Sequence, residues 1–259
     1  MNASDTSAAR PRGGRLAALA DRNLRLFFAG QLTSMVGSMS ALAVTFAVLE
    51  VGGDEVDLGY VMAARIVPLV ALMLVGGVVA DRFGPRRVMV TAEFVQFAVE
   101  AGFGTALILG RPPIWLFVVL VAAWGVGEAF VIPARGAVIP QVAAWGAQYE
   151  GKLRDANALS GLAQSIAGVA GPAVGGFAVA LVGSGAVVLL DAATCPVSAT
   201  ALALLRIPAG MATGTAPRER GAIRAGLRIF ASHTWLWVTT LHVTLFNLLV
   251  WAPFLVLGP

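Results

Sequence analysis

Long apolar runs separated by short charged segments dominate the chain. Each run has roughly 20 residues or more, enough for a helix rising about 1.5 Å per residue to cross a hydrocarbon core of about 30 Å. The segment Gly183–Gly185 divides the longest apolar region into two runs. We therefore predict an all-α, polytopic membrane bundle with spans at Leu26–Leu49, Leu58–Ala80, Val88–Leu109, Ile114–Ala134, Leu159–Val182, Ala186–Leu205 and Trp235–Leu257.

The polar segments divide this pattern into four regions. A polar connection, Arg135–Asn157, is expected between the fourth and fifth spans. Low hydrophobicity and many small polar residues predict disorder at the N-terminus. The predicted regions are a disordered cytoplasmic tail at 1–22, a six-helix bundle at 23–205, a cytoplasmic linker at 206–228, and the first helix of a second, truncated bundle at 229–259.

Basic residues are distributed unequally between the two faces of this predicted bundle. If the N-terminus is inside, the inner segments hold all of the 18 lysines and arginines except Arg65 and Arg111. The first outer loop, around Asp54, is acidic. Because cytoplasmic loops are enriched in lysine and arginine, the N-terminus is predicted to be cytoplasmic in a cell membrane. A seven-helix receptor would place it outside, which the charges oppose.

Composition excludes several other classes of protein. Hydrophobic residues make up 58% of the chain and charged residues only 12%, whereas soluble domains carry about 25% charged residues. The basic residues lie between spans, so nucleic-acid binding is not indicated. Cys195 is the single cysteine. No phosphate-binding Gly-x-x-x-x-Gly-Lys loop, His/Cys cluster or Gly-x-Ser-x-Gly motif occurs, so no cofactor, metal or enzymatic chemistry is predicted.

A charged segment, Gly77–Arg87, joins the second and third predicted spans, and we expect a tight hairpin at one membrane face. It resembles the Gly-x-x-x-Asp-Arg-x-Gly-Arg-Lys loop of the major facilitator superfamily. The matching residues are Gly77, Asp81, Arg82, Gly84 and Arg86, and Pro85 replaces the first basic position. The resemblance implies a gating latch on the cytoplasmic side, whose partner helix belongs to the second half of that fold. The alternative is a basic anchor that only sets topology.

A second motif lies in the fifth predicted span. The residues Gly168, Gly171, Pro172, Gly175 and Gly176 resemble the Gly-x-x-x-Gly-Pro-x-x-Gly-Gly antiporter motif of the same superfamily, which marks exporters that exchange substrate for protons. Small residues on one helical stripe allow close helix packing, and proline predicts a bend. A generic packing stripe is the alternative. Weaker likenesses at Asp21–Gln31 and Ile132–Arg135 point to the branch holding enterobactin and macrolide exporters.

Five ionisable residues lie within the predicted spans, where leaving a charge in lipid costs roughly 2.5–3.5 kcal/mol on insertion scales. They are Arg65, Glu93, Glu100, Glu128 and Asp191. Glu128 is the first candidate for protonation or cation contact, with a structural hydrogen-bonding role as the alternative. Arg65 and Asp191 lie at matching depth, which allows an ion pair, although Arg65 could instead extend to the surface. Glu93 is either buried or a solvated carboxylate at the membrane interface.

Together these features predict a secondary transporter resembling small-molecule exporters of drug or siderophore type, working by alternating access with proton antiport. Glu128, Glu100, Arg65 and Asp191 are the candidate proton or substrate path. Many proton-coupled members of the superfamily carry an arginine inside the fourth span, and the predicted span has none. Because one half of the fold is absent, we expect a missing C-terminal half or second chain. The other hypothesis is a non-transporting membrane subunit or inactive remnant, and uptake is disfavoured by the antiporter-like motif.

Overall fold

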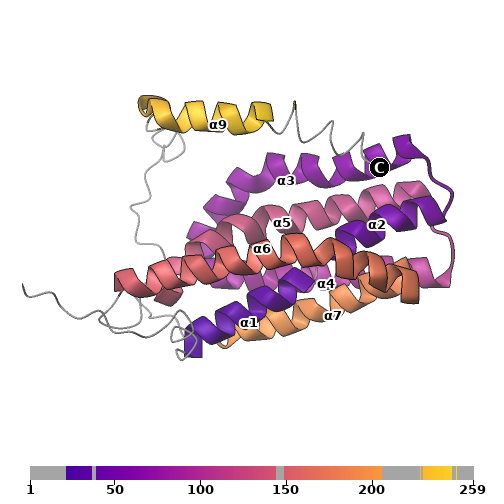
Figure 1. The fold of residues 1–259 in the computed structure, drawn as a ribbon, viewed down its shortest axis with the longest axis horizontal. Helices are drawn as coiled ribbons and strands as arrows, with labels where there is room; N and C mark the ends of the chain where they lie inside the picture. Colours follow the sequence, from indigo (N-terminus) through magenta and orange to yellow (C-terminus); the bar gives the residue numbers. More distant parts are fainter. Residues whose placement is uncertain are drawn as a thin grey trace, which may run out of the picture. The chain divides into compact units, whose positions relative to one another are not determined.

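Every regular element in the computed structural model is a helix, which confirms the predicted all-α fold for the described residues, 22–36, 39–143, 149–205, 228, 230–246 and 249. The chain forms two compact units, residues 1–214 and 215–259. In the first unit, helices α1 to α7 lie alongside one another as a bundle (Figure 1). The helices are α1 (Arg22–Val36), α2 (Met39–Glu50), α3 (Glu55–Phe83), α4 (Pro85–Leu109), α5 (Ile114–Ala143), α6 (Tyr149–Val182), α7 (Ser184–Ala203) and, in the second unit, α9 (Thr234–Phe246).

Five of these helices are long and apolar enough to cross a membrane, namely α3, α4, α5, α6 and α7. They correspond to the second through sixth predicted spans. The predicted first span falls on α1 and the shorter apolar helix α2, and the predicted seventh span begins with α9. The N-terminal tail, nearly all of the 206–228 linker and most of the seventh span after Phe246 lie outside the described residues.

Local sequence explains where the long helices begin and end. Asp54 caps α3, because its carboxylate accepts hydrogen bonds from the backbone N–H groups of Val56 and Asp57, both at 2.9 Å. The α3–α4 hairpin turns at Gly84, whose φ of 88° suits glycine, and Pro85 starts α4. Gly183, with a φ of 81°, separates α6 from α7 as the sequence predicts.

The predicted polar connection between the fourth and fifth spans is wrong over most of its length. Helix α5 continues past Ala134 to Ala143, and α6 already begins at Tyr149. The first charge after the apolar run, Arg135, therefore lies within α5 rather than in a loop. A charge can be accommodated there because its side chain faces a polar cavity, described below, instead of lipid.

Glycines allow two pairs of helices in the bundle to approach closely. A Cβ atom on Gly76 or Gly125 would collide with backbone carbonyl groups across the α3–α5 contact, those of Ala129 and Arg65 respectively. A Cβ on Gly104 would lie 2.9 Å from the Gly185 carbonyl oxygen, across the α4–α7 contact. Small residues at helix contacts are typical of membrane bundles, where backbones pack closely.

Two apolar clusters fill the interior of the bundle. One contains Ala43, Val61, Phe103, Phe117 and Val188, and the other contains Phe27, Met89, Val131, Val138 and Leu202. Along α4, α5 and α7, the carboxylates Glu93, Glu100, Glu128 and Asp191 lie in sequence between members of the two clusters. The polar residues thus form a layer between two apolar regions, and large apolar side chains such as Val70, Leu74 and Phe177 cover the outside.

Candidate functional site

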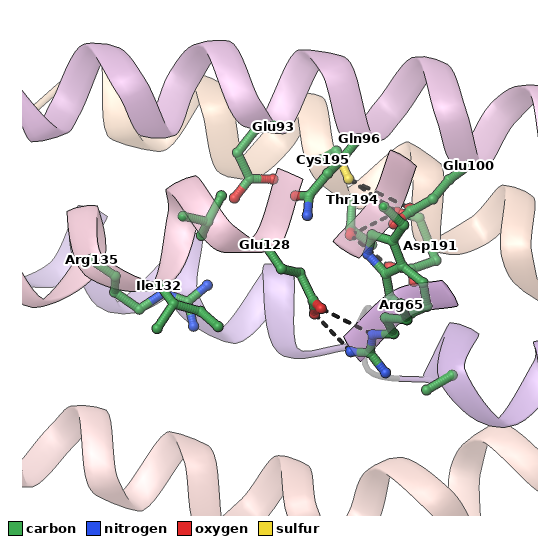
Figure 2. A pocket seen from close by; sticks show the side chains of 13 residues that line it. Arg65, Glu93, Gln96, Glu100, Glu128, Ile132, Arg135, Asp191, Thr194 and Cys195 are labelled. Atoms are coloured by element: carbon green, nitrogen blue, oxygen red, sulfur yellow. Dashed lines mark hydrogen bonds and ion pairs between the residues drawn. The ribbon is translucent and has the colours of Figure 1, made fainter. Parts of the chain in front are cut away.

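A cavity of about 270 Å³ lies within the first unit, between the two apolar clusters. Figure 2 shows charged side chains from several helices pointing into it. It contains four carboxylates and two guanidinium groups. The lining comes from α2 (Ala41), α3 (Arg65), α4 (Glu93, Gln96, Glu100), α5 (Trp124, Glu128, Val131, Ile132, Arg135) and α7 (Asp191, Thr194, Cys195).

The strongest contact in the cavity joins α3 to α5. Arg65 binds Glu128 with two parallel hydrogen bonds, Nε to Oε2 at 2.9 Å and Nη2 to Oε1 at 2.7 Å. The guanidinium also lies over the Trp124 ring, 4.2 Å from its centroid. Gly125 lets the α5 backbone approach that of Arg65 closely, which places Glu128, one turn later, within reach. This bidentate geometry is the strong form of an arginine–carboxylate pair.

Helix α4 presents two buried carboxylates to the cavity. Glu93 is 2% exposed and accepts a hydrogen bond from the Ser198 hydroxyl at 2.9 Å. Glu100 is also buried, and the Cys195 thiol donates to its Oε2 atom at 3.7 Å. Between them, Gln96 packs against Gly127 of α5. The spacing of these three residues on α4 places them on one helical face.

Asp191 on α7 has hydroxyl groups but no arginine or lysine as its hydrogen-bond partners. It is 5% exposed, and the Thr194 hydroxyl lies 3.4 Å from its Oδ1 atom while bonding mainly to the Asp191 backbone carbonyl at 2.8 Å. Its Oδ2 atom makes no hydrogen bond within the described residues. The hydroxyl of Ser40, on α2, is also buried and lies beside the Asp191 carboxylate as a hydrogen-bond donor. Buried polar atoms without partners are rare and require an explanation.

The structure brings all four candidate path residues to one cavity, but with different pairing from that expected. Arg65 pairs with Glu128, so the expected pair with Asp191 is wrong, and so is the extension of Arg65 to the surface. Glu93 is buried, so its interpretation as a solvated interface carboxylate is also wrong. Depth along the spans favours Asp191 as the partner, but depth says nothing of helix rotation, which brings Glu128 to Arg65 instead.

Sequence reasoning missed Arg135 as a cavity residue, because it assigned this charge to a loop. The structure places it on α5, seven residues and about two turns after Glu128, so both side chains face the same cavity. The prediction that the fourth span contains no arginine is therefore wrong. The apolar pattern continues after Arg135 through Val138 and Val142, and this pattern indicates that the helix extends past Arg135.

The hairpin motif residues lie at the junction of α3 and α4, away from the cavity. Arg86 binds the last turn of α7: its Nε donates to the Leu202 carbonyl at 3.0 Å, and its Nη2 donates to the Ala203 carbonyl. Asp81 and Arg82 are exposed, and Gly84 forms the turn. Gly77, on α3, faces Pro133 of α5. Carbonyl groups at a helix C-terminus lack intrahelical donors, and Arg86 donates to two of them, although the Leu202 carbonyl also accepts from the Leu205 backbone N–H at 3.2 Å.

The antiporter-like motif lies on α6, which runs unbroken through Pro172. Gly171 and Gly175 are buried, and a Cβ on Gly175 would lie 3.3 Å from that of Met39 on α2. Gly176 faces Leu42 of α2 in the same way, whereas Gly168 and Pro172 are exposed. The motif therefore packs within the bundle at Gly171, Gly175 and Gly176, but not at Gly168 and Pro172.

A second cavity, of about 500 Å³, lies among α3, α4 and α5, but its lining is apolar apart from Arg87 and Thr91. Since it holds one charged side chain, it offers little chemistry beside that of the charged cavity.

Comparison with known proteins agrees with the resemblance of the two motifs. A family model described as "Transmembrane secretion effector", within the major facilitator superfamily, matches residues 13–257. The chain belongs to this family. Its members are transporters rather than enzymes.

Relatives of known type are efflux proteins. Macrolide efflux protein A of Streptococcus pyogenes is 24% identical over 182 residues, which cover 70% of this chain and 44% of that protein. The multidrug efflux pump Tap of Mycobacterium tuberculosis is 28% identical over 213 residues, covering 78% and 49%. The uncharacterized transporter YfiS of Bacillus subtilis is 24% identical over 211 residues, covering 80% and 48%. The chain spans about half the length of these relatives.

Proposed function

We propose that this transporter exports small molecules, drugs among them, by alternating access coupled to proton antiport. The observation that carries the proposal is the charged cavity between two apolar clusters. A polar chamber within a membrane bundle provides a place where solute and ions can bind at membrane depth. The efflux relatives support the direction of transport and the class of substrate.

Proton exchange is supported by the chemistry of the cavity wall. Glu128, Glu100 and Asp191 can bind protons, and Arg65 can compensate a carboxylate when its proton leaves. The antiporter-like motif on α6 supports the same assignment. The hairpin residues Asp81 and Arg86 are proposed to latch the side that carries most arginines, which the positive-inside rule assigns to the cytoplasm together with the N-terminus.

We also propose that transport requires a second bundle, supplied by a further part of the protein or by a second chain. Alternating access moves one bundle against another around a shared site. This chain matches about half of each efflux relative. The same coverage favours a competing candidate, a non-transporting membrane subunit that binds a partner.

Efflux measurements separate these functions. Cells expressing the 259-residue chain are loaded with a macrolide or a cationic dye, and retention is followed with and without co-expression of a second bundle, the C-terminal half of a Tap relative. The proposal expects no efflux from the chain alone and proton-dependent efflux when the second bundle is present. Efflux by a single copy of the chain would refute the two-bundle requirement. Failure of both arrangements, with folded protein in the membrane, would favour the non-transporting subunit.

A further inference from the structure

The second cavity, of about 500 Å³, is a groove open to the outside of the bundle between α3 and α4, with α5 as its floor. In its wall, Phe83 and Val95 remain 55% and 49% exposed. Close helix contacts explain why the groove stays open. Gly76 and Gly125 hold α3 against α5, and Gly104 holds α4 against α7, so the two helices of the hairpin pack on other neighbours more than on each other.

The groove changes in polarity along its length. Arg87 lies in the first turn of α4, beside the hairpin turn, and Val95 follows about 12 Å deeper along the same helix. Apart from Arg87 and Thr91, the residues that line the groove are apolar. Since the hydrocarbon core of a bilayer is about 30 Å thick, the groove runs from one membrane interface to near the centre, within a single leaflet. This arrangement suits an amphiphile with its polar end at the interface.

The polar end of the groove is positively charged. Arg87 is exposed and forms no ion pair with any carboxylate among the described residues. Arg82 lies over the ring of Phe83, 5.3 Å from its centroid, which places a second positive charge beside the groove wall. The Gly77–Arg87 hairpin contains one carboxylate, Asp81, against three arginines. Basic pockets between membrane helices bind anionic lipid head groups.

We propose that this groove binds one anionic phospholipid from the leaflet on the side of the α3–α4 hairpin. The lipid phosphate lies against Arg87, and one acyl chain follows α4 past Thr91 and Val95 toward the centre of the bilayer. A neutral lipid would fill the apolar part equally well. The preference for a negative head group is therefore what distinguishes this site from lipid that merely covers an apolar surface, with Arg87 extended into water.

The bound lipid lies directly behind the charged cavity. Gly127 of α5 belongs to the groove wall, and a Cβ atom there would be 2.9 Å from the Cγ atom of Gln96, which lines the charged cavity. The acyl chain thus covers the α4–α5 contact from the outside. Because a ligand that binds the folded chain stabilises it, the lipid should also raise Tm.

The test is native mass spectrometry of the purified 259-residue chain in detergent, which counts bound lipid molecules. The probes are phosphatidylglycerol, phosphatidylcholine with the same acyl chains, and glycerophosphoglycerol, which is the anionic head group without acyl chains. The proposal expects one phosphatidylglycerol to bind roughly fivefold more tightly than phosphatidylcholine, as for one arginine at an anionic lipid surface. Equal affinity for the two lipids would overturn it. Competition by glycerophosphoglycerol at equal concentration would also overturn it, by showing an anion site that needs no acyl chain.

Charge variants test the polar end. Arg87→Gln should lower the affinity for phosphatidylglycerol roughly fivefold, to that for phosphatidylcholine, which should not change. Arg87→Lys should keep the preference. Arg154→Gln is the charge-matched control, because Arg154 is exposed on α6 and does not line the groove. An equal loss of preference in Arg154→Gln would show that overall charge, not this site, selects the lipid, and would refute the assignment.

A bulk variant tests the apolar part. Val95→Trp fills the groove and should weaken binding of phosphatidylglycerol roughly tenfold, comparable to losing two buried methylene groups. Val75→Trp is the control, because Val75 is 48% exposed, like Val95, but lies outside the groove. Phosphatidylglycerol with a photoreactive diazirine in its acyl chain should crosslink to the α4 peptide that contains Val95. Unchanged binding in Val95→Trp, or crosslinks confined to other helices, would refute the site.

The second bundle is the competing occupant of the groove. Phosphatidylglycerol binding is therefore repeated after co-purification with the C-terminal half of a Tap relative. Binding that persists supports the lipid site, whereas its loss would assign the groove to the contact between bundles and overturn the proposal. None of these measurements uses transport, so their failure would refute the lipid site and leave the transport function standing.

Discussion

The two sides of the cavity differ in how their charges are balanced. On the α3–α5 side, Glu128 meets Arg65 through two hydrogen bonds, and the contact is fixed by the close backbone approach at Gly125. On the α4–α7 side, Glu100 and Asp191 have only a thiol and hydroxyl groups as donors, and no arginine binds either of them. A paired charge stabilises a fixed arrangement, whereas an unpaired one is available to bind something. The cavity thus combines an ion pair that holds two helices together with two carboxylates that no arginine binds.

The largest loss of stability is expected when the ion pair on the α3–α5 side of the cavity is broken. Arg65→Met removes the partner of Glu128 and leaves its charge uncompensated. Breaking a buried pair costs about 3–5 kcal/mol, and since these side chains are 26% and 21% exposed we expect about 2–3 kcal/mol of lost stability. Thermal unfolding in detergent micelles measures it.

The matched control for Arg65→Met is the double variant Arg65→Met with Glu128→Gln. It removes both charges and should recover much of the lost stability. A double variant as unstable as the single one would mean that the charges do not interact, and the comparison between the two sides would fail.

A smaller loss is expected when the backbone contact behind the pair is changed. In Gly125→Ala the new methyl group meets the Arg65 carbonyl, so α3 and α5 must separate. Overpacking of this kind costs about 1–3 kcal/mol. Gly102→Ala is the control, because nothing lies within 4 Å of a Cβ there, and replacing a helical glycine by alanine should stabilise by about 0.5–1 kcal/mol. Equal effects of the two changes in a Tm comparison would contradict the close contact.

Much of this architecture follows from the apolar pattern alone. Spans two to six, the turn at Gly183 and the charged hairpin are visible in the sequence, because lipid requires long apolar helices and loops carry the charges. The ionisable residues of the path also stand out in apolar runs. Their grouping in one cavity is not readable from the sequence, since it depends on the rotation of each helix.

The remaining features depend on contacts between distant segments. Arg65 and Glu128 are 63 positions apart, and matching depth along the spans favours Asp191 as the partner of Arg65 instead. The predicted end of the span before Arg135 is wrong because the charge marks only the end of the first apolar run, and α5 continues through it. The roles of Ser40 and Ser198 came only from the structure, because small hydroxyl residues in a span carry no distinctive signal.

An arginine outside the cavity shows whether the effect of Arg65 comes from its carboxylate partner. Arg86 binds the neutral carbonyl groups of Leu202 and Ala203 rather than an acid. Arg86→Gln should therefore cost about 1 kcal/mol, as typical for lost hydrogen bonds to a helix C-terminus. Unfolding under matched micelle conditions measures the loss. A loss equal to that of Arg65→Met would show that arginine packing, not charge pairing, sets the stability of the balanced side.

The smallest change in stability is expected on the α4–α7 side of the cavity. There the sign of the change is the informative result. Asp191→Asn removes a buried charge that has no cationic partner and reduces its repulsion with Glu100. Stability should change by less than about 1 kcal/mol, and an increase is expected at high pH. A loss as large as that of Arg65→Met would mean that Asp191 has a strong partner. In that case both sides would be balanced, and the comparison between them would fail.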